Sequence, residues 1–139
     1  MVDRPMVLKP LRAALAWAAL ILVLCLMPGS ALPTWEWADL ISLDKLIHAV
    51  IFGILMVLLL KGFAGQAPAS PLFKNAVMIA LVTTILYGCS MELLQQIPGL
   101  GRRGDILDVI ANTAGAFGAW GWVRWRSSRE RQRGNALEV

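Results

Sequence analysis

Four long apolar segments divide this chain of 139 residues, and they constrain its fold more than any other feature of the sequence. The segments extend over residues 11–28, 44–61, 75–96 and 105–125. A helix needs about 20 apolar residues to cross the hydrocarbon core of a bilayer. The second segment is short for a span, but Lys45 and Lys61 at its ends can extend to the two membrane surfaces. The sequence therefore predicts an all-α protein, an integral membrane four-helix bundle.

The composition agrees with a membrane protein and argues against a nucleic-acid binder. Hydrophobic residues make up 58% of the chain and the mean hydropathy is +0.64, both above the usual values for soluble domains. Most Lys and Arg residues are gathered at the two ends and in one loop, which is typical of a membrane protein. No soluble domain interrupts the apolar segments. We therefore expect one membrane domain over residues 1–139, with a basic cytoplasmic tail at residues 126–139.

The distribution of charge predicts the orientation, because cytoplasmic segments of membrane proteins are enriched in Lys and Arg. Positive charge precedes the first apolar segment, separates the second from the third, and follows the fourth. The residues are Arg4, Lys9, Arg12, Lys61, Lys74, Arg124, Arg126, Arg129, Arg131 and Arg133. The first connection carries Glu36 and Asp39 instead. Both termini are therefore expected in the cytoplasm. Small residues at 29–31 also suit a cleaved signal peptide, but three further apolar segments favour a retained first helix.

This orientation brings polar residues from three separate segments to one depth, near the outer surface. They are Asp44, Lys45 and His48 in the second helix, Glu92 and Gln95 in the third, and Asp105, Asp108 and Asn112 in the fourth. Asp44 and His48 are four residues apart and share a helix face. The helix face that carries Asp105, Asp108 and Asn112 continues through Gly115 and Ala119. Small residues such as these allow helices to approach closely. We therefore expect this face to contact protein rather than lipid.

Two interpretations of these polar residues are open. In the first, the acids pair with Lys45, Arg102 and Arg103 in a salt-bridge network. In the second, they line an outward-facing pocket that binds a ligand or transfers protons, which is the default hypothesis for ionisable residues on facing membrane helices. In that pocket Arg103 could hold a phosphate or carboxylate through two parallel hydrogen bonds.

The residue types narrow the chemistry of such a pocket. His48, Glu92 and Asp108 are the candidates for acid–base catalysis, because an imidazole beside a carboxylate can accept and return a proton near neutral pH. One His among several carboxylates is a poor inventory for a zinc site, so we expect no bound metal and no cofactor. Ser90 has no nucleophile-elbow motif around it, which disfavours a serine hydrolase.

At these residues the sequence resembles the VanZ-like family of bacterial membrane proteins. The resemblance rests on residues 44–48, 92–95 and 103–115, and it covers the chain from Asp44 to Trp122. The family is named for an accessory protein associated with teicoplanin resistance, and its members are compact helical membrane proteins. The resemblance implies that the characteristic positions of the family fall on Asp44, Lys45, His48, Glu92, Gln95, Asp105, Asp108 and Asn112.

The residues and the resemblance together predict an accessory or binding protein of the cell envelope rather than an enzyme. The expected ligand-binding residues are Asp44, Lys45, His48, Glu92, Gln95, Arg103, Asp105, Asp108 and Asn112. The partners would be membrane lipids, a lipid-linked cell-wall precursor or an envelope protein, with association of several copies left open. One alternative is an intramembrane acid–base enzyme acting on a lipid or cell-wall precursor. A proton-coupled carrier is another, which four short helices and a site far from the midplane disfavour.

Overall fold

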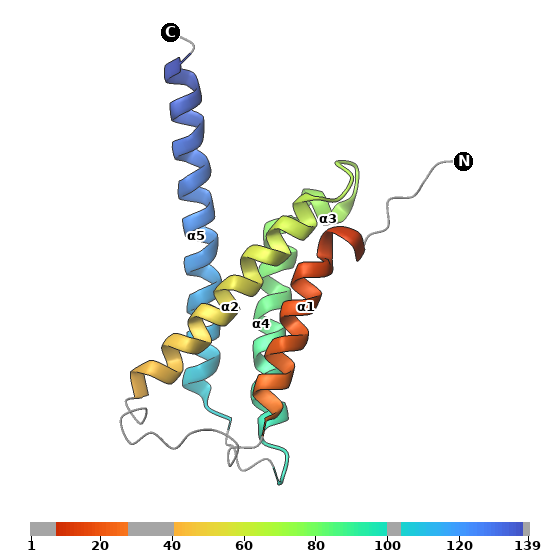
Figure 1. The fold of residues 1–139 in the computed structure, drawn as a ribbon, viewed down its shortest axis with the longest axis vertical. Helices are drawn as coiled ribbons and strands as arrows, with labels where there is room; N and C mark the ends of the chain where they lie inside the picture. The colour runs from red at the N-terminus through yellow and green to blue at the C-terminus, as the bar shows by residue number, and fades with distance from the viewer. Residues whose placement is uncertain (1–7, 28–40, 100–103, 138–139) are drawn as a thin grey trace, which may run out of the picture.

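The structure, a computed structural model, describes residues 8–27, 41–99 and 104–137. Every regular element in these ranges is a helix. The helices are α1 (Leu8–Leu26), α2 (Ile41–Ala64), α3 (Pro71–Lys74), α4 (Ala76–Gln95) and α5 (Ile106–Leu137). Helix α2 is central and contacts all four of the others, and α5 projects well beyond the rest of the molecule (Figure 1). The all-α prediction is therefore confirmed for the described residues.

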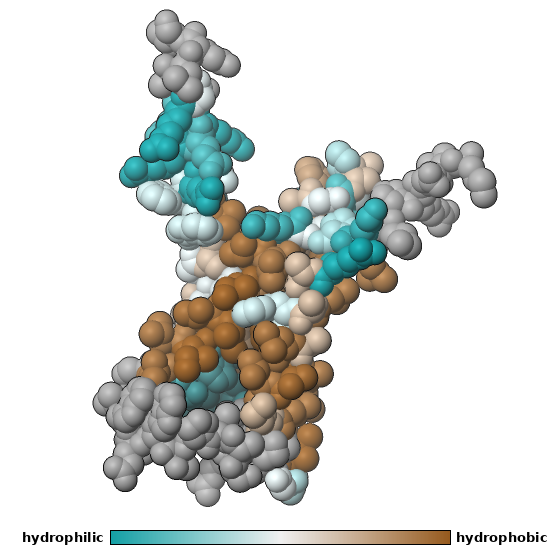
Figure 2. Space-filling view, viewed as in Figure 1, coloured by the Kyte–Doolittle hydropathy of each residue, from teal (hydrophilic) through white to brown (hydrophobic). Residues whose placement is uncertain are grey.

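Within the described ranges, three helices are long and apolar enough to cross a membrane, at Leu8–Leu26, Leu43–Ala64 and Ala76–Gln95. Helix α5 is not among them, because polar residues such as Asp108 and Asn112 lower the hydropathy of its first half. Large apolar side chains nevertheless face outward from several helices, and Figure 2 shows apolar residues over most of the middle of the face in view. A soluble monomer rarely exposes so much apolar surface. The chain is thus a helical membrane protein, and a fourth span remains a prediction.

Small residues set the close packing of α2 against α5. A Cβ atom added to Gly115 would collide with the backbone of Ala49, and one added to Gly53 would lie 3.2 Å from the carbonyl oxygen of Gly115. Ala116 is fully buried, and Ala119 lies beside Gly53. The face that begins with Asn112 and continues through Gly115 and Ala119 therefore contacts α2, as its small residues predict.

Aromatic side chains tie α1 to the other helices. The indole N–H of Trp17 donates a 2.9 Å hydrogen bond to the carbonyl oxygen of Ile51 in α2. The hydroxyl of Tyr87 in α4 donates a 2.6 Å hydrogen bond to the carbonyl oxygen of Ala18. Between these contacts lies an apolar core whose largest fully buried side chain is Phe52. These two hydrogen bonds dock the middle of α1 on α2 and α4.

Two features of the connections and ends go beyond the sequence-based expectations. The second connection contains the short helix α3, where the hydroxyl of Ser70 accepts a hydrogen bond from the backbone N–H of Leu72. Helix α5 continues to Leu137, so residues 126–137 of the expected basic tail are helical. The N-terminal end of α1 and the C-terminal end of α5 lie at the same end of the molecule (Figure 1). This arrangement is compatible with both termini on one side of a membrane.

Candidate functional site

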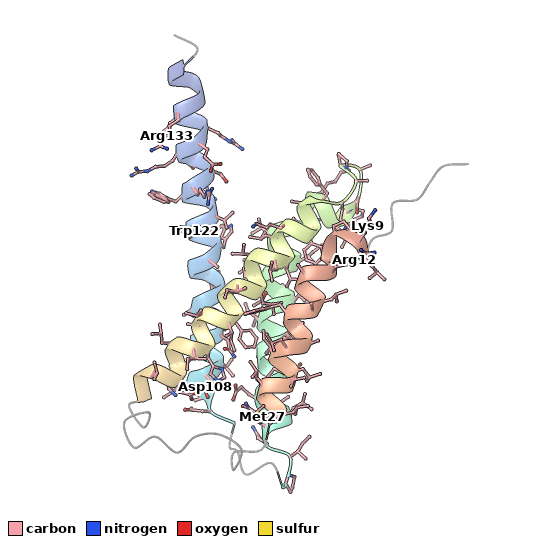
Figure 3. All side chains as sticks on the ribbon, viewed as in Figure 1. Lys9, Arg12, Met27, Asp108, Trp122 and Arg133 are labelled. Carbon is pink, nitrogen blue, oxygen red and sulfur yellow. The ribbon has the colours of Figure 1, made fainter. Side chains whose placement is uncertain are left out.

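The start of α2, the end of α4 and the start of α5 meet at one end of the molecule (Figure 1). Three segments that are distant in the sequence thereby place their polar side chains together. We call Asp44, Lys45, His48, Glu92, Asp105, Asp108 and Asn112 the polar cluster. Figure 3 shows Asp108 at this end, far from Arg133, and Figure 2 shows hydrophilic surface set among apolar residues there.

Lys45 joins α2 to the start of α5. Its ammonium group lies 3.0 Å from Oδ2 of Asp105 and 3.1 Å from Oδ1 of Asp108. The other oxygen of Asp105 accepts a 2.9 Å hydrogen bond from the backbone N–H of Leu107, which caps the first turn of α5. This N–H, and then the Lys45 ammonium, hold the pKa of Asp105 below its ordinary value. This part of the polar cluster is a salt-bridge network, as the first interpretation expects.

His48 lies deeper than Lys45 and makes one hydrogen bond to the described residues. Its Nδ1 is 3.1 Å from the amide oxygen of Asn112. An amide oxygen only accepts hydrogen bonds, so Nδ1 carries a proton, and in the neutral imidazole Nε2 then presents a lone pair. Nε2 lies 3.9 Å from an oxygen of Asp44 and 4.0 Å from an oxygen of Asp108, beyond hydrogen-bond distance. The ring stacks parallel to Phe52, with centroids 6.5 Å apart, which fixes its plane.

Glu92 brings a buried carboxylate to the same place from α4. Only 4% of the residue is exposed. Its Oε2 accepts a 3.0 Å hydrogen bond from the backbone N–H of Asp105, whereas Oε1 lies 3.9 Å from Nδ1 of His48. Among the described residues, Oε1 of Glu92 and Nδ2 of Asn112 are buried without a hydrogen-bond partner. A buried polar atom without a partner costs about 1–3 kcal/mol, so such atoms mark places where a ligand group would be stabilised.

The structure brings together seven of the nine residues expected to bind a ligand, namely those of the polar cluster. Gln95 does not join them, because its amide lies 3.5 Å from the carbonyl oxygen of Cys25 in α1. The sequence could not predict this contact, because it does not show which neighbouring helix covers the face of α4 that carries Gln95. Arg103 lies outside the described residues. Asp44 reaches the polar cluster only at its edge, because 56% of its side chain is exposed.

The polar cluster has more negative than positive charge. Its acids are Asp44, Glu92, Asp105 and Asp108, and its described bases are Lys45 and His48, so ionised acids outnumber the bases. The attraction between opposite charges is much stronger at a partly buried site than in water. The described residues therefore favour a ligand that brings positive charge.

Comparison with known proteins assigns the chain to a family. A family profile described as VanZ/LLP1 matches residues 7–127. The chain belongs to this family. The match includes every residue of the polar cluster, and it confirms the resemblance drawn from residues 44–48, 92–95 and 103–115. Neither the curated proteins nor the solved structures contain a match to the chain. Family membership therefore identifies a membrane protein of VanZ type, and its role has to be argued from the site.

Proposed function

We propose that this protein is an accessory binding protein of the bacterial cell envelope, whose polar cluster holds the headgroup of a lipid or of a lipid-linked cell-wall precursor. The observation that carries the proposal is the buried Oε1 of Glu92, which lacks a hydrogen-bond partner beside His48. A network that served only to hold helices together would be expected to satisfy its buried atoms. A headgroup could supply the donor that Glu92 lacks.

The proposed position in the membrane follows from charge and exposure. Helix α5 exposes Ile106, Ile110 and Phe117 along its first half, which suits contact with lipid as the fourth span. Lys and Arg residues such as Lys9, Arg12 and Arg133 gather at the end of the molecule where α1 begins and α5 ends (Figure 3), which the positive-inside rule assigns to the cytoplasm. The polar cluster then lies near the outer surface of the cytoplasmic membrane. There it would meet headgroups of the outer leaflet and lipid-linked intermediates of the cell wall.

A lipid-binding measurement tests the proposal. The purified protein is placed in nanodiscs or detergent, and its affinity is measured for phosphatidylethanolamine, phosphatidylglycerol and a lipid-linked cell-wall precursor. We expect the Glu92→Gln variant to bind the preferred lipid at least about tenfold more weakly, because one charge-assisted hydrogen bond contributes about 1.5–3 kcal/mol. The Glu130→Gln variant is the matched control, since Glu130 pairs with Arg126 on the exposed part of α5. Equal affinities for the wild type and Glu92→Gln would contradict the proposal.

An intramembrane acid–base enzyme is the second candidate, and the geometry of His48 favours it. In the neutral ring Nε2 has a lone pair, and on the other side the buried carboxylate of Glu92 lies 3.9 Å from Nδ1. A general base needs such a lone pair, and a neighbouring carboxylate would stabilise the imidazolium that forms. This candidate predicts turnover of a lipid or cell-wall precursor that collapses in His48→Ala while the variant still folds. Unchanged turnover in that variant would remove His48 from the mechanism.

A further inference from the structure

Three potential metal-ligand atoms of the polar cluster face one another. They are Oδ1 of Asp44, Nε2 of His48 and Oδ2 of Asp108, and one such atom from each residue lies within 4.8 Å of those of the other two. His48 and Asp108 are buried, whereas Asp44 closes the group from the exposed side. Each of these atoms can donate an electron pair to a metal ion when His48 is neutral and both carboxyl groups are ionised.

Asn112 sets which ring nitrogen of His48 faces this group. Nδ1 donates to the amide oxygen of Asn112, so Nε2 is the nitrogen directed toward the two carboxylates. When His48 is neutral, Nε2 and the two carboxylate oxygens repel one another unless a cation lies among them. A metal-bound histidine usually donates its other ring N–H to an oxygen acceptor, which is the role of Asn112 here.

The distances allow an ion at this position. Zn²⁺ binds His nitrogen and carboxylate oxygen at about 2.0–2.2 Å, so two ligands of a tetrahedral ion lie about 3.4 Å apart. Nε2 of His48 lies 3.9 Å from Oδ1 of Asp44 and 4.0 Å from Oδ2 of Asp108, so each distance needs to shorten by only about half an ångström. The side chain of Asp44 is exposed and can therefore move further than the buried side chains of His48 and Asp108. Lys45 bonds to the opposite oxygen of Asp108 and leaves Oδ2 available.

We propose that Asp44, His48 and Asp108 bind one divalent transition-metal ion of the Zn²⁺ type. Three protein ligands leave a fourth position of a tetrahedral ion open, as in catalytic zinc sites. That position faces the edge of the polar cluster and would accept a phosphate oxygen of a headgroup. This last step rests on the proposed function, since it makes phosphate the group of the lipid that is recognised. The metal site reverses the expectation of no bound metal, which a count of residue types alone had suggested.

The test is a titration of the purified, chelator-treated protein with Zn²⁺, followed by calorimetry, and with Co²⁺, followed by its visible absorption. We expect one ion per chain, with the dissociation constant raised at least tenfold in Asp44→Asn and in His48→Gln. Asp44→Asn is the decisive variant, because its exposed side chain contributes little to folding. Glu130→Gln, which removes one negative charge far from the polar cluster, should bind as the wild type does. Absence of binding, or equal affinity in wild type and Asp44→Asn, would overturn the proposal.

Repeating the lipid measurement with and without chelator separates this inference from the proposed function. Stoichiometric Zn²⁺ binding that depends on Asp44, without lipid binding, would support the metal site and contradict the headgroup proposal. Lipid binding that is insensitive to chelator, in a protein that takes up no Zn²⁺, would overturn the metal site and leave the headgroup proposal standing. Binding of phosphatidylglycerol only in the presence of Zn²⁺ would support both.

A separate observation carries a second inference at the opposite end of the molecule. A cavity of about 580 Å³ lies between the end of α2, the start of α4 and the middle of α5. Its wall combines apolar residues with Lys61, Arg124 and Arg131, and with the hydroxyls of Ser127 and Ser128. None of the described residues that line the cavity carries a carboxylate. Basic pockets between membrane helices on the cytoplasmic side bind anionic lipid headgroups.

We infer that this basic cavity holds the phosphate of an anionic phospholipid, with the acyl chains along its apolar wall. Native mass spectrometry of the protein with phosphatidylglycerol or phosphatidylcholine measures the preference. Replacing Arg124 and Arg131 by Gln should reduce the preference for phosphatidylglycerol at least fivefold. Replacing Arg129 and Arg133 by Gln removes the same charge from the same helix outside the cavity, and should change the preference less than twofold. Equal effects of the two double variants, or no preference in the wild type, would overturn the inference.

Discussion

The contact between Gly115 and Ala49 makes the sharpest prediction about how the polar cluster is held together. A Cβ atom at Gly115 would lie 2.8 Å from Cα of Ala49, about 1 Å closer than an ordinary carbon–carbon contact. Both partners are helix backbone, so the two helices would have to separate. Overpacking of this kind costs about 1–3 kcal/mol. Separation of α2 from α5 would also pull His48 away from Asn112, one turn along the same interface.

Gly118 is the matched control for Gly115→Ala. It lies three residues further along the same helix, and an added Cβ there would meet nothing within 4 Å. Both substitutions change the intrinsic helix propensity equally, by about 1 kcal/mol. The difference between the two variants therefore isolates the steric cost, which we expect to be about 1–3 kcal/mol in favour of Gly118→Ala. Unfolding in mixed micelles measures it, and equal stability of the two variants would refute this account of the interface.

Three further predictions concern the bonds between helices. Lys45→Met should destabilise the protein more than Glu130→Gln in the same unfolding assay. Loss of Lys45 leaves the carboxylate of the buried Asp108 without its ammonium partner. The exposed ion pair between Glu130 and Arg126 contributes only about 0.5 kcal/mol. Tyr87→Phe should cost about 1 kcal/mol through loss of its hydrogen bond to α1, and a cost of zero would contradict the contact. The lowered pKa of Asp105 means that its stabilising effect is fully present above the unfolded pKa, about 3.9, and is lost as the pH falls through the lower folded pKa. Acid titration of stability should therefore show a weaker decline below about pH 4 in Asp105→Asn than in the wild type.

Much of the fold could be predicted from the sequence, because the hydrophobic pattern of a membrane helix is local. The helix bounds differ from the expected ranges by one to three residues at most ends, and the main difference is the extension of α5 to Leu137. That extension is polar, so hydropathy gave no reason to continue the helix. Its cation–π contacts, such as Arg129 over Trp125 at 4.6 Å, join residues four apart and depend on the helix already being formed.

The composition of the candidate site was predictable for a different reason. Polar residues are costly inside a membrane, so their occurrence at corresponding ends of three apolar segments indicates that they meet. Which of them touch could not be predicted, because each contact depends on the rotation of one helix about its axis. Gln95 illustrates this, since it lies three residues from Glu92 and yet bonds to α1 instead of joining the polar cluster.

The sequence by itself determined a helical membrane chain with one polar end, because apolar length and the cost of burying charge act along the chain. The tertiary structure alone decided how that polar end is organised. It joined Lys45 to Asp105 and Asp108 in a salt-bridge network, and it placed Nε2 of His48 3.9 Å from Asp44 and 4.0 Å from Asp108. These arrangements need atoms from α2 and α5 within about 4 Å. The close approach depends on Gly115, a residue that carries no chemistry of its own.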